Sequence, residues 1–503
     1  MPLLLAFLPL VVLIALLAVT IRIFGSDALS GGSQICLLLS AATCVILGRW
    51  VNHKKWVDFE NAIAHNISGV TSALIILLLI GALSGAWMVS GVVPTLICYG
   101  VQIIHPSFFL VSCCVICALV SVMTGSSWTT IATIGIALMG IGRAQGFDDG
   151  WVAGAIISGA YFGDKISPLS DTTILAASVT DTPLFRHIRY LLYTTIPSLV
   201  VALTVFAIKG ATHDAAALGE MQTFTSALEN TFVISPWLLI VPIFTAILIA
   251  RRVSSIITLF SSAILAALAA LLVQPNLISS IAAVGGVEGL SDVEIGFKGV
   301  YTTLFGSTSL STGHPDTDAL VATRGMAGMM DTLWLIICAM CFGGAMTAGG
   351  MLESITRFFV RFARGRLSMV GSTVGAGLLV NIATADQYIS IILTGRMFKE
   401  PFRAAGYESR LLSRTTEDAV TVTSPLIPWN TCGLTQSTVL GVATLTYLPY
   451  CIFNLVSPLM SILIAATGWR IYRVGRKSGT PIDPHNPALT GDAAAAVLPP
   501  REG

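Results

Sequence analysis

Charged side chains are scarce in this sequence. Asp, Glu, Lys and Arg make up 11% of its 503 residues, whereas hydrophobic residues make up 54%. Soluble globular proteins carry about 25% charged residues, so the composition excludes an ordinary soluble domain and indicates a polytopic membrane protein. The formal net charge of +1 gives no indication of nucleic-acid binding.

The sequence also lacks histidines beside its clustered cysteines and the features of a typical signal peptide. The apolar run LVSCCVICALV contains no histidine beside Cys113, Cys114 and Cys117. A metal or disulfide role is therefore not expected for these cysteines, because small polarisable side chains suit the packing of helices in lipid. The stretch 2–24 has no basic region, and its apolar run is too long for a typical signal peptide. It is therefore predicted to be a retained first span.

Apolar stretches long enough to cross a bilayer recur along the chain. We expect spans at about residues 2–24, 33–48, 70–90, 188–208, 232–250, 255–273, 332–352 and 445–468. Longer apolar stretches interrupted by polar residues lie at 108–142, 151–180, 367–395 and 411–435. Polar external connectors are expected at 210–231 and 275–331, and a disordered cytoplasmic tail at 478–503, which is rich in Pro, Gly and Ala.

The interruption at 159–173 reads GAYFGDKISPLSDTT. A helix is expected to break at Pro168, because proline lacks the amide proton and disfavours a helical residue before it. Polar, non-helical backbone at membrane depth is tolerated only where protein or a water-filled cavity satisfies it. Asp164 and Asp171 flank the break, where half-helix ends and oxygen ligands would suit a small cation. The hydroxyl ligands expected here are Ser167, Ser170, Thr172 and Thr173.

A second copy of this pattern occurs later, as RTTEDAVTVTSPLIPWNTCG. Three pairs of positions match: Asp164 with Asp418, Pro168 with Pro425, and Asp171 with Asn430. Upstream of each copy, ALVSVMTGSSWTTI aligns with GLLVNIATADQYISI, and each segment is predicted to hold the tip of a hairpin. The chain is therefore predicted to consist of two homologous halves, 1–209 and 232–477.

The basic residues are distributed differently in the two halves, and such residues mark the cytoplasmic side. Arg49, Lys54 and Lys55 precede the third span of the first half, whereas CYGVQIIHP after it has no Lys or Arg. In the second half Arg324 stands alone before the matching span, and four arginines occur within 357–366 after it. Opposite charge at matching connections predicts inverted-topology repeats with both termini cytoplasmic.

The expected architecture has about ten spans and two opposing re-entrant hairpins, at 108–142 and 367–395. Two full crossings per hairpin would give the same sidedness.

Ionisable residues inside spanning segments are costly, so they are candidates for function. The candidate cation- and proton-binding residues are Asp164, Asp171, Asp386, Glu417, Asp418 and Asn430, with Na+ expected at Asp164 and Asp171. The supporting ligands are Thr124, Ser126, Ser127, Ser167, Ser170, Thr172, Thr173, Thr384 and Thr431, the charge partner is Lys165, and the hinges are Gly163, Pro168 and Pro425. Simpler alternatives are helix capping by Asp386, neutralisation of Asp164 by Lys165, and helix packing by Gly125–Ser127.

Buried carboxylic acids suggest a mechanism. An acid in a low-dielectric pocket has its pKa raised towards physiological pH. Such a group can hold a proton or a sodium ion, but not both. If the loaded site alternates in its access to the two sides, cation–proton exchange follows. No cofactor is expected, because Na+ and H+ would be the cargo.

Four motifs carry a resemblance to a known family. GAYFGDKISPLSDTT, TGSSWTTIATIG, TADQYISIILTGRMF and RTTEDAVTVTSPLIPWNTCG resemble signatures of the NhaC-type Na+/H+ antiporters, within the ion transporter superfamily. The resemblance covers most of residues 70–465. It implies a bacterial inner-membrane antiporter, built from inverted repeats with opposing hairpins and usually dimeric. The family also contains exchangers of malate and lactate, so the resemblance does not fix the substrate.

Two other functions are considered. A Na+/H+-coupled organic-acid exchanger needs a cation for its carboxylate substrate. Lys165 is expected to be the only cation of the two tips and the two broken stretches, and Asp386 would repel an anion, which favours cation exchange. An intramembrane aspartyl protease would use two membrane acids as a dyad, but YFGD at 161–164 lacks the first glycine of the GxGD signature. The chain is therefore predicted to be a transporter and not an enzyme.

Overall fold

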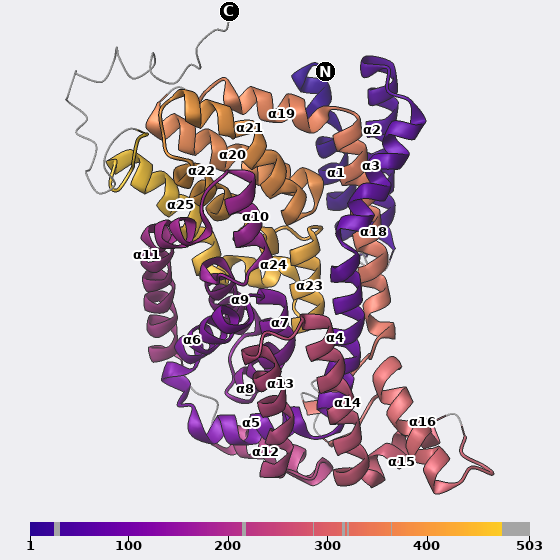
Figure 1. Ribbon diagram of the computed structural model, residues 1–503. Helices are drawn as coiled ribbons and strands as arrows, with labels where there is room; N and C mark the ends of the chain where they lie inside the picture. Colours follow the sequence, from indigo (N-terminus) through magenta and orange to yellow (C-terminus); the bar gives the residue numbers. More distant parts are fainter. Residues whose placement is uncertain are drawn as a thin grey trace, which may run out of the picture.

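The computed structural model describes residues 1–24, 31–213, 218–284, 286–313, 317–318, 321–363 and 365–474. The described chain is a bundle of helices (Figure 1), with two isolated β-bridges, Thr308 to Thr323 and Tyr407 to Arg473. The tail expected at 478–503 lies outside the described residues.

The helices of the first half are α1 (Leu3–Phe24), α2 (Gly32–Asn52), α3 (Trp56–Gly69), α4 (Thr71–Val89), α5 (Val92–Ile103), α6 (Pro106–Thr124), α7 (Ser127–Thr130), the π-helix η2 (Ile131–Gly135), α8 (Ile136–Ala144), α9 (Asp149–Ile166), α10 (Asp171–Val179) and α11 (Leu184–Ala211). The second half contains α12 (Leu218–Thr231), η3 (Pro236–Leu239), α13 (Ile240–Ala250), α14 (Ser255–Val273), α15 (Pro275–Ala283), α16 (Asp292–Phe305), η4 (Ala327–Met329), α18 (Met330–Ala348), α19 (Met351–Val360), α20 (Arg366–Thr384), α21 (Gln387–Ala404), α22 (Ser409–Thr416), η5 (Glu417–Thr421), η6 (Ser424–Leu426), α23 (Thr431–Leu440), α24 (Thr444–Tyr447), η7 (Leu448–Tyr450) and α25 (Ile452–Thr467).

Eight described helices are long and apolar enough to cross a bilayer. They are α1, α2, α4, α6, α11, α14, α18 with η4, and α20. Two bent pairs raise the number to ten if each counts as one span, Gln222–Thr231 with Pro236–Ala250 (89°) and Thr444–Tyr450 with Ile452–Thr467 (56°). The prediction of an all-helical polytopic membrane protein is confirmed.

Both stretches predicted to contain broken helices do so. In the first, α9 ends at Ile166, and Pro168 stands in the turn that separates it from α10. In the second, α22 continues into the π-helix η5, and Pro425 lies in the 3₁₀-helix η6 before α23 begins. The two copies therefore differ in local structure, because Asp164 stands in a regular helix and Asp418 in a π-helix. Short π-helical segments are frequently found at functional sites.

The two helix-to-helix turns lie where hairpin tips were predicted. α6 ends at Thr124 and α20 at Thr384. Gly125 (φ +67°) and Ala385 (φ +57°) follow in the left-handed region. A Cβ at Gly125 would lie 2.6 Å from the Leu169 Cβ, so glycine lets this tip approach the turn between α9 and α10. Figure 1 shows α20 and α21 in the upper part of the molecule and α6 and α8 in the lower part. Re-entrant hairpins and inverted repeats stay predictions.

Close packing of α9 on α6 positions the first broken stretch. Cβ atoms at Gly159 and Gly163 would lie 2.1 Å from the Cys114 oxygen and 2.4 Å from the Ala118 oxygen. Small residues thus let the two backbones touch, as is common between membrane helices. Gly163, expected to be a hinge, lies inside α9 at this contact. All ten cysteines are free and nine are buried, which agrees with a packing role for Cys113, Cys114 and Cys117.

The two connectors expected as polar loops are largely helical, which corrects that expectation. α12 occupies most of 218–231, and α15 and α16 occupy much of 275–305. A capping box opens α16, since the Ser291 hydroxyl accepts from the Glu294 amide while the Glu294 carboxylate accepts from the Ser291 amide. The polar composition that indicated a loop is the exposed face of α16, whose Gly299 and Thr303 are buried.

Candidate functional site

Asp164 lies near the C-terminal end of α9 and is 6% exposed. Its Oδ2 atom accepts hydrogen bonds from the Ser127 backbone amide (3.2 Å) and from the Ser127 hydroxyl (2.7 Å). Ser127 is the first residue of α7. The structure therefore joins the first hairpin tip to the first broken stretch through a carboxylate held by neutral donors.

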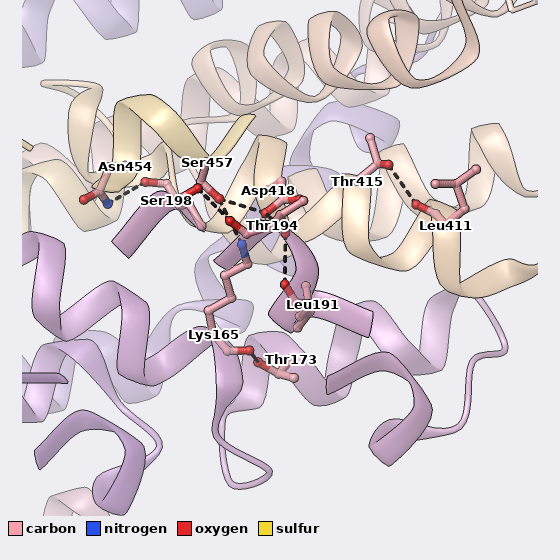
Figure 2. Close-up of polar contacts among 11 residues, drawn as sticks. Lys165, Thr173, Leu191, Thr194, Ser198, Leu411, Thr415, Asp418, Asn454 and Ser457 are labelled. Atoms are coloured by element: carbon pink, nitrogen blue, oxygen red, sulfur yellow. Dashed lines mark hydrogen bonds and ion pairs between the residues drawn. The ribbon is translucent and has the colours of Figure 1, made fainter. Parts of the chain in front are cut away.

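Lys165, the next residue, forms a buried ion pair with Asp418 of η5 (Figure 2). Its Nζ atom also donates to the Ser457 hydroxyl at 2.9 Å. Ser457 in turn donates to Asp418 Oδ1 at 2.8 Å, and Thr194 donates to the same oxygen at 3.2 Å. A buried ion pair is tolerated only when such additional hydrogen bonds offset the desolvation of both charges. The charge partner of Lys165 is thus Asp418 from the other broken stretch, and not the adjacent Asp164.

Asp386 is buried at the second tip. It is the N-cap of α21, because its Oδ1 atom accepts from the Ile389 amide at 3.0 Å. Its Oδ2 atom accepts from the Thr431 hydroxyl at 3.3 Å. Asp386 therefore caps a helix, which was the simpler alternative to ion binding. Its Oδ2 atom also links the second tip to the start of α23. Whether the carboxylate also binds a cation stays a prediction.

Glu417 and Arg414 are both fully buried near the end of α22. Within the described chain, neither carboxyl oxygen of Glu417 accepts a hydrogen bond and no guanidinium nitrogen of Arg414 donates one. The Arg414 guanidinium lies 4.5 Å from the centre of the Tyr190 ring. The expectation that Lys165 is the only cation of the broken stretches is wrong. Arg414 stands in RTTED at the start of the second motif, so the sequence already contained the signal that identifies it.

Asp171 and Asn430 occupy matching positions at two helix starts. Asp171 is the exposed first residue of α10, after the N-cap Ser170. Its carboxyl group lies within electrostatic reach of Asp164, but no hydrogen bond joins these two side chains among the described contacts. Asn430 is buried and caps α23, since its Oδ1 atom accepts from the Cys432 amide at 3.0 Å. Both residues therefore stand at a helix start, Asp171 one position after the N-cap and Asn430 at the N-cap itself.

The hydroxyl side chains expected as supporting ligands are engaged in local hydrogen bonds. At the tips, Thr124 donates to the Ser126 carbonyl (3.1 Å) and Thr384 to the Asp386 carbonyl (3.0 Å). At the first break, the Ser167 hydroxyl donates to the Val122 carbonyl and the Thr173 hydroxyl donates to the Lys165 carbonyl. The hydroxyl groups of Ser170 and Thr172 form a hydrogen bond with each other. These bonds satisfy backbone that the turns leave unpaired. Cation binding by these hydroxyls stays a prediction.

The buried acids Asp164, Asp386 and Asp418, together with the polar side chains around them, form a polar centre. Four of its residues were not identified by any pattern in the sequence. Thr194 and Ser457 belong to α11 and α25, two ordinary apolar helices. Asn381 of α20 accepts a hydrogen bond from the Asn430 side chain at 2.9 Å. Tyr388 of α21 lies within electrostatic reach of the carboxyl groups of Asp164, Asp171 and Asp386. Single polar residues in apolar helices are common, so only their position in the fold distinguishes these four.

No group of three or more His, Cys, Asp or Glu side chains in the described ranges is arranged to hold a metal ion. A transported hard cation does not need such a group of side chains, since backbone carbonyl, hydroxyl and water oxygens also serve as ligands for such ions. The Ser127 hydroxyl of the first tip and the Ser170 hydroxyl of the first break lie next to the Asp164 carboxyl group and are oxygen ligands of this kind.

Comparisons with known proteins identify the family of the chain. The family model of the Na+/H+ antiporter family matches residues 159–469. The chain is 36% identical over 434 residues to the Na+/H+ antiporter NhaC of Alkalihalophilus pseudofirmus, covering 86% of this chain and 89% of that protein. It is 35% identical to the malate-2H+/Na+-lactate antiporter of Bacillus subtilis, with 86% and 89% covered. It is 33% identical to the Na+/H+ antiporter NhaC of Bacillus subtilis, with 86% and 91% covered. The chain belongs to the Na+/H+ antiporter family.

Proposed function

We propose that this protein is a secondary active transporter that exchanges Na+ for H+, with Asp164 as the exchanging acid. One observation carries the proposal. Asp164 is buried and accepts hydrogen bonds from Ser127, but the neighbouring cation, Lys165, pairs with Asp418. A buried carboxylate without a cation partner is costly, so either a proton or Na+ lowers its free energy. Competition between the two for one carboxyl group couples their transport.

The other acids have supporting roles in this mechanism. Asp171, at the exposed start of α10, receives Na+ from the aqueous side and shares it with Asp164. Asp386 and Asn430 hold the second tip against α23, and Asp386 adds negative charge to the polar centre. Asp418 and Glu417 belong to the second broken stretch, and Lys165 of the first broken stretch neutralises Asp418. Pro168 and Pro425 serve as hinges when access alternates. No cofactor is needed.

The same proposal includes the architecture and the location. The chain forms two inverted repeats, 1–209 and 232–477, in the bacterial inner membrane, with both termini cytoplasmic and with a second copy as its partner in a homodimer. The inverted arrangement is supported by the opposite charge at matching connections and by the similar breaks in both halves. The cargo consists of Na+ and protons.

The decisive experiment uses purified protein in liposomes with a trapped pH-sensitive dye. Na+ alone is expected to move protons, and Asp164→Asn is expected to abolish this movement. Asp171→Asn is expected to weaken it through a higher apparent KM for Na+. The control is Asp181→Asn, which removes an exposed acid paired with Lys399 and is expected to leave exchange intact. Absence of any response to Na+ without an organic acid would refute Na+/H+ exchange as the function.

Arg414 favours a second candidate function, the exchange of organic acids coupled to Na+ and H+. A guanidinium group binds a carboxylate through two parallel hydrogen bonds, and the Arg414 nitrogens have no acceptor among the described residues. A relative with 35% identity is a malate-2H+/Na+-lactate antiporter. Arg414→Gln tests the two candidates in the same liposomes. Loss of malate or lactate flux with intact Na+/H+ exchange would support the second one.

A further inference from the structure

An apolar groove of about 390 Å³ lies between α11 and α25, outside the polar centre. Its walls include Tyr193 and Pro197 of α11, Leu463 and Thr467 of α25, and Trp469 just after α25. The two helices run antiparallel here, since the start of α11 and the end of α25 lie at the same end of the groove (Figure 1). The rings of Tyr193 and Trp469 meet edge to face at 5.3 Å and close that end.

The groove opens onto an apolar surface. Ile196 and Val200 of α11 and Leu459 and Leu463 of α25 are each at least half exposed, and Trp469 is 49% exposed. In a membrane protein, such a surface faces lipid, and tyrosine and tryptophan rings gather where the hydrocarbon meets the headgroups. The occupant that fits the groove is therefore an acyl chain whose headgroup lies near Trp469.

Arginines surround the headgroup end of the groove. The Arg470 guanidinium lies 5.8 Å from the centre of the Tyr193 ring. Arg189 is exposed and lies one turn before Tyr193 on the same face of α11. Arg366 adds a third positive charge at the end of α25, where it donates to the Ala465 and Ala466 carbonyls at 2.6 and 2.8 Å. Within the described ranges, none of these three arginines forms an ion pair with a carboxylate.

We propose that this groove binds an anionic phospholipid. One acyl chain lies between α11 and α25, and the phosphate group lies between Arg189 and Arg470. Basic pockets between membrane helices bind acidic lipid headgroups, because each basic residue near the surface attracts the negative charge of the headgroup. The apolar groove selects a lipid over free phosphate, and the arginines select an anionic lipid over a zwitterionic one. This proposal is independent of which ion the protein exchanges.

Trp469 provides a probe inside the groove. The protein is reconstituted in phosphatidylcholine vesicles that contain a small fraction of phosphatidylglycerol or phosphatidylcholine with brominated chains, which quench tryptophan on contact. The chain has nine tryptophans, so the signal of Trp469 is the difference between the wild type and Trp469→Phe. Brominated phosphatidylglycerol is expected to quench Trp469 at a roughly tenfold lower mole fraction than brominated phosphatidylcholine.

Arg189→Gln/Arg470→Gln is expected to abolish this preference, and Arg189→Lys/Arg470→Lys is expected to retain it. The matched control is Arg361→Gln/Arg403→Gln, which removes two exposed arginines elsewhere and is expected to leave the preference unchanged. Equal quenching by both lipids in the wild type, or an unchanged preference in Arg189→Gln/Arg470→Gln, would overturn the proposal. Displacement of the quencher by inorganic phosphate alone would also overturn it, since it would identify a free anion as the ligand.

Discussion

Asp164 and Asp418 are matching residues of the two similar motifs, yet their surroundings differ. Asp418 has a lysine and two hydroxyl groups as partners, so its negative charge is neutralised inside the protein. Asp164 instead has the neutral donors Ser127 and Ser170 beside its carboxyl group. The two motifs also differ beside the acid, where Lys165 in the first corresponds to Ala419 in the second. We infer that one acid became structural and the other exchanges ions.

The Lys165–Asp418 pair gives the first prediction. Lys165→Met leaves Asp418 buried without a counter-charge and is expected to lower the free energy of unfolding by about 3–5 kcal/mol. Lys165→Met/Asp418→Leu removes both charges and is expected to recover most of that loss. Thermal unfolding of the purified protein measures both effects. Lys399→Met breaks the more exposed pair with Asp181 and should cost less than about 1 kcal/mol. A stable Lys165→Met variant would contradict the prediction.

Asp386 gives the second prediction, which separates capping from ion binding. Asparagine caps a helix as well as aspartate does, so Asp386→Asn is expected to keep the stability of the wild type. Asp386→Ala removes the cap and is expected to cost about 0.5–2 kcal/mol. If the carboxylate also contributes to cation binding, Asp386→Asn raises the apparent KM for Na+ in the liposome assay. Unchanged transport by Asp386→Asn would restrict this residue to its capping role.

At the scale of elements, the sequence predicted where helices break. Pro168 and Pro425 stand in the two breaks, and Ser126 and Asp386 cap the helices after the two tips. These are local signals, because proline geometry and N-cap hydrogen bonds involve only a few neighbouring residues. The pairing of Lys165 with Asp418 spans 253 positions, and periodicity does not identify such a partner. The π-helix at Glu417–Thr421 was likewise not predictable, since it contains no proline or glycine that would mark it.

The first tip gives the third prediction. Gly125 has φ +67°, and a Cβ there would lie 2.6 Å from the Leu169 Cβ, so Gly125→Ala is expected to push α7 away from the α9–α10 turn. The expected cost is about 1–3 kcal/mol, with a loss of exchange because Ser127 moves away from Asp164. Gly371→Ala is the control, since Gly371 lies inside α20 with open space around its Cβ position. It is expected to stabilise the protein slightly. Both are measured by thermal unfolding and the liposome assay.

At the scale of the whole molecule, the two halves meet in a shared polar centre. The second break supplies Asp418 to Lys165 of the first break. Thr194 of α11 and Ser457 of α25 donate to the same carboxylate. Helices from both halves thus contact one group, which is an arrangement that the proposed inverted repeats would give if their two-fold axis passed close to it. Because both halves contact Asp418, movement of either half changes the hydrogen bonds and the ion pair of this carboxylate.

Inverted topology gives the last prediction, because it requires matching connections to lie on opposite sides of the membrane. His105 follows α5 and Arg361 follows α19, so these two exposed residues would be equivalent in the proposed repeats. We expect Arg361→Cys to react with a membrane-impermeant maleimide only from the cytoplasmic side, since basic residues surround it, and His105→Cys only from the outside. The wild type is a suitable background because nine of its ten cysteines are buried. Labelling of both variants from the same side would show that the halves are parallel, and the proposed inverted topology would be wrong.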